Sequence, residues 1–247
     1  MTENKEKEEK VAEYFNNLNK AFKQESWKAY DKHAQGYDES LNNGKFKIYE
    51  TFMKIILEKN YPKDVEIVDY GCGTGIPQEY MFKSEYKNVD GFDASKEMVE
   101  IAKKKNIYRK LDVIECGKGV ERIKDYANKY DIVISIGVFG PMHIMEEGLD
   151  ELVALLNPQS KVKDIIFNTK AVEIDLNNKI RAYFNKLKDE GKVISMEELN
   201  FKRWDDYFAN EKIQVNTHIE TNNSDLDGIF HIIRLAWLSY NLFLNIR

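Results

Sequence analysis

Three glycines at alternate positions, with an acidic residue just ahead of them, form a segment that suggests ligand binding. Gly71, Gly73 and Gly75 follow the short apolar run of residues 65–70, and Asp69 stands inside that run. Glycines placed after a strand let the backbone turn tightly and come close to a ligand. A helix that starts directly after them presents unpaired N–H groups to polar or anionic ligand atoms. The segment therefore indicates a binding loop between a strand and a helix.

A second acidic residue lies further along the chain, at the end of the next predicted strand. Asp93 follows the strand predicted for residues 88–92. A carboxylate about twenty residues after a glycine loop can accept hydrogen bonds from both ribose hydroxyls of a nucleoside. The alternative is a glycine turn and an exposed acid that bind nothing. Because strand, loop, helix and acid are in register, we interpret the pair as a nucleoside-cofactor site.

The spacing of the glycines separates two kinds of nucleoside cofactor. Dinucleotide sites follow the pattern G-x-G-x-x-G, whereas here the third glycine, Gly75, comes one position earlier. S-adenosylmethionine contains no pyrophosphate, so its loop does not have to form a diphosphate cradle. This spacing, with Asp69 ahead of it, favours S-adenosylmethionine, and an NAD-dependent oxidoreductase is the disfavoured alternative.

The elements that would position these residues alternate along the chain. Predicted strands cover residues 65–70, 88–92, 110–115, 131–139 and 164–169, and helical patterns lie between them. A further antiparallel pair is predicted for residues 201–208 and 212–219. Strands that alternate with helices imply parallel pairing and right-handed crossovers. The predicted fold is therefore α/β: a Rossmann-like, doubly wound, mostly parallel seven-stranded sheet with an N-terminal helical lid.

The two ends of the chain depart from this alternating pattern. Residues 1–29 are predicted to form a polar tail and a helix, because lysines and glutamates alternate first and an apolar periodicity follows. The main domain is predicted to span residues 30–220. Residues 221–247 would then be a polar linker and an apolar helix. In that helix the polar residues fall on one narrow stripe, which favours docking on the protein over contact with a membrane interface.

Four segments resemble the motifs of one enzyme family. The first and second motifs of class I S-adenosylmethionine-dependent methyltransferases are similar to VDYGCGTG and GFDASKEM, and the fourth-strand motif is similar to YDIVISIGVF. The YDxxAxxYD segment that often precedes the fold is similar to YDKHAQGYD. The order of the motifs also resembles the methyltransferase-like protein of the Williams-Beuren syndrome region and its relatives. The resemblance covers residues 27–220.

The resemblance implies a cofactor role for several residues of this chain. Asp93 would hold the ribose hydroxyls, and Ala94 would touch the adenine edge. Ile136 and Gly137 would flank the methionine carboxyl or the sulfonium, and Tyr37 would fold over the cofactor as part of a lid. The methionine and ribose would lie along Gly71, Cys72, Gly73, Thr74 and Gly75. Relatives often carry an Asp after the third strand that meets the adenine, whereas this chain has none in residues 115–118.

No residue can be assigned to catalysis from the sequence. The sulfonium methyl is already activated, so the protein mainly has to place a nucleophile in line with it. A general base is needed only where the nucleophile arrives protonated. His143 and His33 are candidate bases, with a structural histidine as the favoured alternative, and Cys72 is better explained by packing than as a nucleophile. Three aromatic residues either stack on a substrate or attach the N-terminal helix: Trp27, Tyr30 and Tyr37.

Composition and charge limit the classes of molecule that the protein is expected to bind. The net charge of -5 and the pI of about 5.6 disfavour nucleic acid, and the motif [DN]-P-P-[YFW] of base methylation is absent after the fourth strand. Cys72 and Cys116 suit a reducing cytoplasm, and no cluster has metal-ligand spacing. We therefore expect a cytoplasmic enzyme that methylates a small molecule. A non-catalytic S-adenosylmethionine-binding or regulatory protein is the alternative, and the sequence indicates no oligomeric state.

Overall fold

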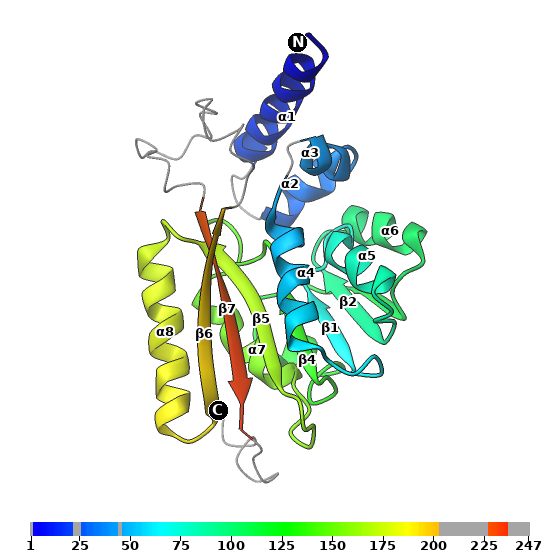
Figure 1. The fold of residues 1–247 in the computed structure, drawn as a ribbon. Helices are drawn as coiled ribbons and strands as arrows, with labels where there is room; N and C mark the ends of the chain where they lie inside the picture. The colour runs from blue at the N-terminus through cyan, green and yellow to red at the C-terminus, as the bar shows by residue number, and fades with distance from the viewer. Residues whose placement is uncertain (1, 22–25, 44–45, 203–226, 237–247) are drawn as a thin grey trace.

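A seven-stranded sheet forms the centre of the computed structural model, which describes residues 2–21, 26–43, 46–202 and 227–236 (Figure 1). Its strand order is β3-β2-β1-β4-β5-β7-β6. The strands are β1 (Ile67–Tyr70), β2 (Val89–Asp93), β3 (Lys110–Val113), β4 (Ile132–Ser135), β5 (Asp164–Lys170), β6 (Val193–Lys202) and β7 (Asp227–Leu235). Strands β1 to β5 pair in parallel, and β7 runs antiparallel to both of its neighbours. The predicted mostly parallel seven-stranded sheet is confirmed.

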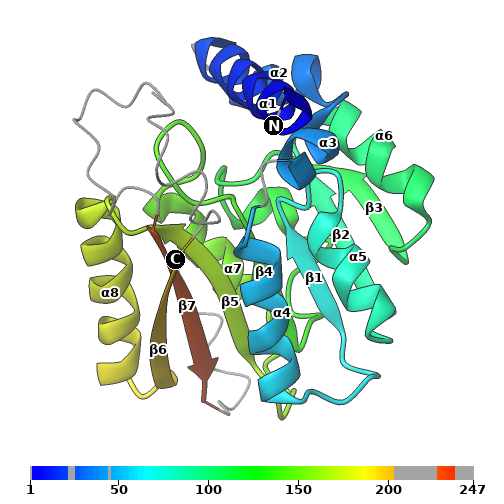
Figure 2. The ribbon, with the colours of Figure 1, turned by 45° about the horizontal axis from the view of Figure 1, so that its top comes forward.

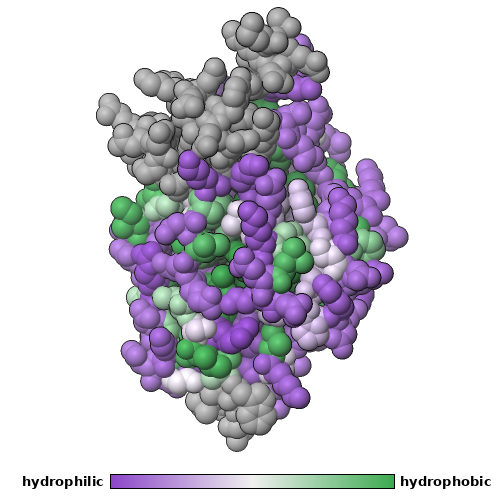
Figure 3. Space-filling view, viewed as in Figure 1, coloured by the Kyte–Doolittle hydropathy of each residue, from purple (hydrophilic) through white to green (hydrophobic). Residues whose placement is uncertain are grey.

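Helices cover both faces of the sheet, as the doubly wound prediction requires. The helices of the main body are α4 (Ile48–Lys59), α5 (Ile76–Lys83), α6 (Lys96–Lys105), α7 (Leu149–Leu155) and α8 (Ile174–Asp189). Alternate side chains of β4 point to opposite faces: Ile132 and Ile134 join the core beneath α4 and α5, and Val133 joins the core beneath α7 and α8. The outer surface of the face seen in Figure 1 is mainly hydrophilic (Figure 3).

Three N-terminal helices lie beyond the carboxyl ends of the parallel strands: α1 (Thr2–Ala21), α2 (Ser26–His33) and α3 (Tyr37–Asn43) (Figures 1 and 2). The polar start of the chain fits either a solvated tail or a frayed helix start, and the structure shows the helix, because residues 2–10 belong to α1. Ion pairs of the Glu6–Lys10 type, four residues apart at 2.9 Å, support a helix in so polar a segment. The hydroxyl of Tyr14 donates to the carbonyl of His33, which attaches α1 to α2.

The prediction of an apolar C-terminal helix is wrong for residues 227–235, which form β7 between β5 and β6. A short apolar run fits a strand buried on both faces as well as a helix, and periodicity alone does not separate the two. Phe230 packs into the core on one face of the sheet and Ile233 into the core on the other. The domain therefore does not end at residue 220, because β7 is an inner strand of its sheet.

The partner predicted for the end of β6 also needs correction. We expected residues 201–208 to pair with residues 212–219, whereas residues 201 and 202 belong to β6 and pair with β7. Residues 203–208, 212–219 and 237–247 lie outside the described part of the chain. In that described part, no helix combines the length and the apolar character that crossing a membrane requires.

Candidate cofactor site

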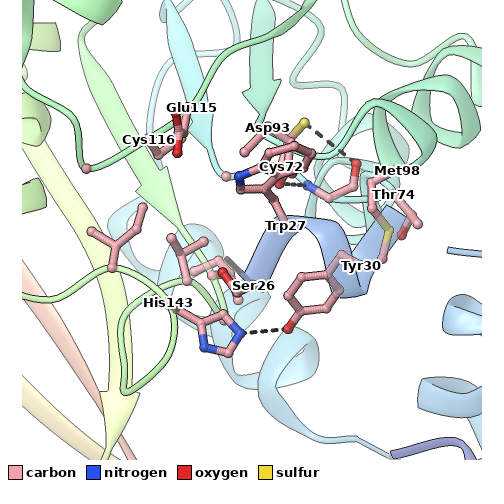
Figure 4. A pocket seen from close by; sticks show the side chains of 18 of the residues that line it. Ser26, Trp27, Tyr30, Cys72, Thr74, Asp93, Met98, Glu115, Cys116 and His143 are labelled. Carbon is pink, nitrogen blue, oxygen red and sulfur yellow. Dashed lines mark hydrogen bonds between the residues drawn. The ribbon is translucent and has the colours of Figure 1, made fainter. Parts of the chain in front are cut away.

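A cavity of about 280 Å³ opens at the carboxyl ends of β1, β2 and β4 (Figure 4). The order of the strands reverses between β1 and β4, which is where open α/β sheets bind their ligands. Helix α2 contributes Trp27 and Tyr30 to the other side of the cavity. Nine of the predicted cofactor residues line it: Tyr37, Gly71, Cys72, Gly73, Thr74, Asp93, Ala94, Ile136 and Gly137.

Two of the predicted cofactor residues, Asp69 and Gly75, lie behind the glycine loop and do not line the cavity. Asp69 is buried and accepts a hydrogen bond from the hydroxyl of Tyr108 at 2.7 Å. Burial raises the pKa of Asp69 to about 7, although the Tyr108 hydroxyl opposes the shift. Gly75 has a φ of +84°, and a Cβ there would lie 2.7 Å from the Tyr108 ring. Both residues therefore support the loop through Tyr108.

The carboxylate of Asp93 connects the glycine loop to the start of α6. It accepts hydrogen bonds from the backbone N–H of Gly73 at 2.9 Å and of Ser95 at 2.8 Å. Burial raises the pKa of Asp93, and the bonds from the amides of Ser95 and Gly73 oppose that rise. Ser95 also caps α6, because its hydroxyl accepts from the N–H of Met98 at 3.2 Å. The loop and the cap thus fix the position of Asp93.

The residues around the cavity fit S-adenosylmethionine. A carboxylate has about four acceptor positions, so Asp93 can receive two ribose hydroxyls besides its two amides. At Gly73 and Gly137, which have φ values of +53° and +81°, a Cβ would meet no atom within 4 Å. The backbone at both glycines is therefore open to the cavity and can lie against the methionine part of the cofactor.

The buried side chain of Glu151 fixes the part of the cavity lining where the sequence lacks the expected adenine-binding Asp. Residues 115–118 line the cavity after β3. The carboxylate of Glu151 accepts from the N–H of Gly117 at 3.0 Å, the N–H of Gly119 at 2.6 Å and the Tyr70 hydroxyl at 2.8 Å. Sequence reasoning missed Glu151, because acidic residues are common in the first turn of any helix.

The two aspartates of YDKHAQGYD attach the N-terminal helices to the predicted motifs. Asp38 accepts from the hydroxyl of Thr74, in the glycine loop, at 2.5 Å. Asp31 accepts from the hydroxyl of Ser95 at 2.6 Å and from the N–H of Glu97 at 3.1 Å. The segment is therefore hydrogen-bonded to both sides of the cofactor site.

Of the candidate catalytic residues, the structure brings only some to the cavity. His143 lines it and lies 2.8 Å from the hydroxyl of Tyr30 (Figure 4), whereas His33 does not line it. Burial raises the pKa of the Cys72 thiol well above its usual value, which disfavours a thiolate nucleophile. Trp27 lines the cavity, and its indole nitrogen is buried without a hydrogen-bond partner. In the described ranges, no three His, Cys, Asp or Glu residues are grouped so as to hold a metal ion.

Comparison with known proteins identifies the central part of the chain. Residues 67–159 match a family described as a methyltransferase domain. This central part of the chain is therefore similar to a methyltransferase domain. The ribosomal protein L11 methyltransferase of Ruminiclostridium cellulolyticum is 30% identical over 83 residues, which are 33% of this chain and 26% of that protein. The match thus spans about a quarter of that relative.

Solved structures share the fold at low sequence identity. A putative methyltransferase in complex with the Haloferax volcanii activator Trm112 has a TM-score of 0.56 at 12% identity, over 85% of this chain and 97% of that one. Thermoplasma acidophilum 1320 has a TM-score of 0.52 at 15% identity, over 77% and 89%. The [4+2]-cyclase SpnF has a TM-score of 0.53 at 14% identity, over 75% and 80%. These similarities establish the fold and leave the reaction open.

Proposed function

We propose that this protein transfers the methyl group of S-adenosylmethionine to a small-molecule acceptor. The observation that carries the proposal is the placement of Asp93 beside the open backbone of Gly73, at the point where the strand order reverses. In this arrangement Asp93 receives the ribose hydroxyls, Ala94 and residues 115–118 border the adenine, and Tyr37 covers the cofactor.

The chemistry requires little of the protein beyond binding and orientation. Bound S-adenosylmethionine supplies an activated methyl group on a sulfonium. The glycine loop and the residues after β4, Ile136 and Gly137, would lie beside the methyl-bearing part of the cofactor. The side chain of Asn168 accepts from the N–H of Gly137 at 2.8 Å and fixes this backbone. The rings of Trp27 and Tyr30 line the cavity on the side of α2. Positioning of this kind lowers the barrier by fixing the nucleophile in line with the methyl group.

Several features favour a small acceptor. The cavity is bordered by the N-terminal helices and by aromatic side chains, and the chain is acidic overall. A protein acceptor is the second candidate, because the matched relative is named for ribosomal protein L11. A non-catalytic S-adenosylmethionine-binding role is the third, since this fold hosts unrelated activities.

Two further expectations concern the cellular compartment and membrane contact. Cys72 and Cys116 are both unbridged, which supports the cytoplasm as the compartment. Membrane contact through a C-terminal helix is no longer proposed for residues 227–235, because they lie inside the sheet as β7. The likeness to the Williams-Beuren-region protein stays a prediction from the order of the motifs.

The experiment that tests the proposal follows labelled methyl groups. The full chain is incubated with methyl-labelled S-adenosylmethionine and either a fractionated metabolite extract or purified ribosomal proteins. We expect label in a metabolite fraction, and none with the Asp93→Ala variant. Label in ribosomal proteins alone would make the acceptor a protein. Binding of S-adenosylhomocysteine without any labelled product would favour the non-catalytic role.

A further inference from the structure

A tyrosine and a histidine meet at the rim of the cavity, although they are far apart in sequence. Tyr30 comes from α2 and His143 from the loop that follows β4 (Figure 4). The Tyr30 hydroxyl lies 2.8 Å from Nε2 of His143, and the ring centroids are 5.6 Å apart. Both side chains line the cavity that holds the predicted cofactor residues. The pair is therefore within reach of a substrate bound beside the cofactor.

The position of the histidine proton follows from the second ring nitrogen. Nδ1 of His143 lies 3.0 Å from the carbonyl oxygen of Pro141. A carbonyl only accepts hydrogen bonds, so in the neutral ring Nδ1 carries the proton and Nε2 carries the lone pair. The hydroxyl of Tyr30 then donates to Nε2. A hydroxyl that donates its own proton can still accept a hydrogen bond through the lone pairs of its oxygen.

We propose that Tyr30 is a catalytic residue that takes the proton of a hydroxyl acceptor, and that His143 acts through it. This inference rests on the proposed methyl transfer. The acceptor proton moves to the Tyr30 oxygen while the Tyr30 proton moves to Nε2 of His143, which becomes an imidazolium. The electron pair left on the acceptor oxygen forms the new O–CH₃ bond, and the pair of the broken S–CH₃ bond stays on sulfur. The imidazolium later returns its proton to solvent.

The surroundings of the pair point to an aromatic hydroxyl as the acceptor class. The cavity is lined by the rings of Trp27, Tyr30, Tyr37 and Tyr49, and flat rings pack favourably against one another. A phenol has a pKa of about 10 and is mostly protonated near neutral pH, so it requires a base. A carboxylate arrives ionised and would have no use for the pair.

A purely structural role for the pair makes a different prediction. If the Tyr30–His143 contact only attached α2 to the body, its loss would weaken cofactor binding and slow every acceptor equally. A proton-transfer role affects only acceptors that arrive protonated. The two roles therefore separate when acceptors of different acidity are compared in the same variant.

The test compares 4-nitrophenol, which is largely ionised at about pH 8, with unsubstituted phenol, which is not. The variants are Tyr30→Phe, which keeps the ring, and His143→Gln, with His33→Gln as a matched histidine control outside the cavity. We expect both rim variants to lose about 10²- to 10⁴-fold in kcat/KM with phenol and less than about tenfold with 4-nitrophenol. The rim variants should bind S-adenosylhomocysteine with unchanged affinity. The control variant His33→Gln should keep the wild-type kcat/KM with both phenols.

Three results would overturn the inference. Equal losses with both phenols, together with weaker binding of S-adenosylhomocysteine, would make the pair structural. Methylation of arylamines but not of phenols would overturn the acceptor class. If neither phenol is methylated while labelled product appears in the metabolite extract, the inference fails and the proposed function stands. If S-adenosylhomocysteine does not bind at all, the proposed function fails as well.

Discussion

Buried carboxylates of the sheet are paired in different ways. On the β5–β7 side, Asp164 is fully buried and accepts from two nitrogens of the Arg234 guanidinium, at 2.7 and 2.6 Å, and from the Tyr61 hydroxyl at 2.6 Å. On the β1–β2 side, Asp69 accepts from one phenol, and Asp93 accepts from two backbone amides. Among the described residues, neither Asp69 nor Asp93 has a cationic partner.

The difference separates Asp164, which stabilises the fold, from Asp93, which is available to a ligand. A buried carboxylate is costly unless it is paired, and a guanidinium is the most complete partner that a protein supplies. Asp164 on β5 has such a partner in Arg234 on β7, and it is not among the residues that line the cofactor cavity. Asp93 lines the cavity, and burial raises its pKa. Donors from a bound nucleoside would complete its hydrogen bonds.

The largest effect is expected at Asp93. Replacing it by alanine removes two charge-assisted hydrogen bonds to the ribose, each worth ~1.5–3 kcal/mol. We expect Asp93→Ala to weaken binding of S-adenosylhomocysteine by at least about 100-fold, measured by calorimetric titration. Circular dichroism should show that the variant is folded. An unchanged dissociation constant in a folded variant would remove Asp93 from the cofactor site.

The next effect is a pH dependence that comes from the other half of the sheet. His231 on β7 is fully buried, and burial lowers its pKa to about 4. Its Nε2 pairs with the Thr169 hydroxyl at 3.0 Å, and Nδ1 lies 3.1 Å from Glu198 without hydrogen-bond geometry. The unfolded chain binds a proton below about pH 6.5 while the folded chain does not, so stability falls as the pH drops towards 4.

We expect the free energy of unfolding of wild type to fall, relative to His231→Gln, by about 2 kcal/mol between about pH 7 and pH 5. Denaturant titrations of both proteins at each pH provide the measurement. Asp69, with a pKa raised to about 7, contributes the opposite slope, and taking the difference between the two proteins cancels it. Parallel curves for the two proteins would show that His231 is not held neutral.

A smaller loss of stability is expected at Asp164. Asp164→Asn keeps the volume and weakens the bonds from Arg234 and Tyr61, which we expect to cost about 1–2 kcal/mol. The estimate is reduced because the Arg234 side chain is 44% exposed and remains solvated. Thermal melting should detect the loss, whereas binding of S-adenosylhomocysteine should not change. A loss of affinity in Asp164→Asn would contradict the distinction between a carboxylate that stabilises the fold and one that binds the ligand.

The smallest effect is expected where the N-terminal helices meet the site. Asp31→Asn weakens the bonds from Ser95 and Glu97, which we expect to cost about 0.5–1.5 kcal/mol locally. Hydrogen exchange of α2 should become faster in Asp31→Asn than in wild type. In wild type, addition of S-adenosylhomocysteine should slow the hydrogen exchange of residues 30–38. Equal exchange with and without the ligand would remove the predicted lid from the mechanism.

Local patterns in the sequence predicted much of the site. The glycine loop, Asp93 and the Ser95 cap belong to one strand–loop–helix unit and its neighbour, so their spacing is set by short-range geometry. The same alternation of strands and helices predicted the doubly wound sheet. Predicted element boundaries were less accurate: the fourth strand was expected over residues 131–139, whereas β4 covers Ile132–Ser135.

Contacts between distant segments account for what the sequence did not reveal. Tyr30 and His143 are 113 positions apart, and Glu151 contacts Gly117 through the packing of α7 rather than through any local pattern. Residues 229–235 fit a helix or a buried strand equally well until their neighbours are known. The two faces of β7 are both covered, which removes the alternation that marks a half-exposed strand.

The central claim is that the cavity at the carboxyl ends of β1, β2 and β4 binds a methionine-derived nucleoside through Asp93. Calorimetric titration of the full chain with S-adenosylhomocysteine, and in parallel with NAD, tests this claim most directly. The account predicts saturable binding of S-adenosylhomocysteine at one site per chain and no binding of NAD. Tighter binding of NAD, or no heat with S-adenosylhomocysteine, would contradict it.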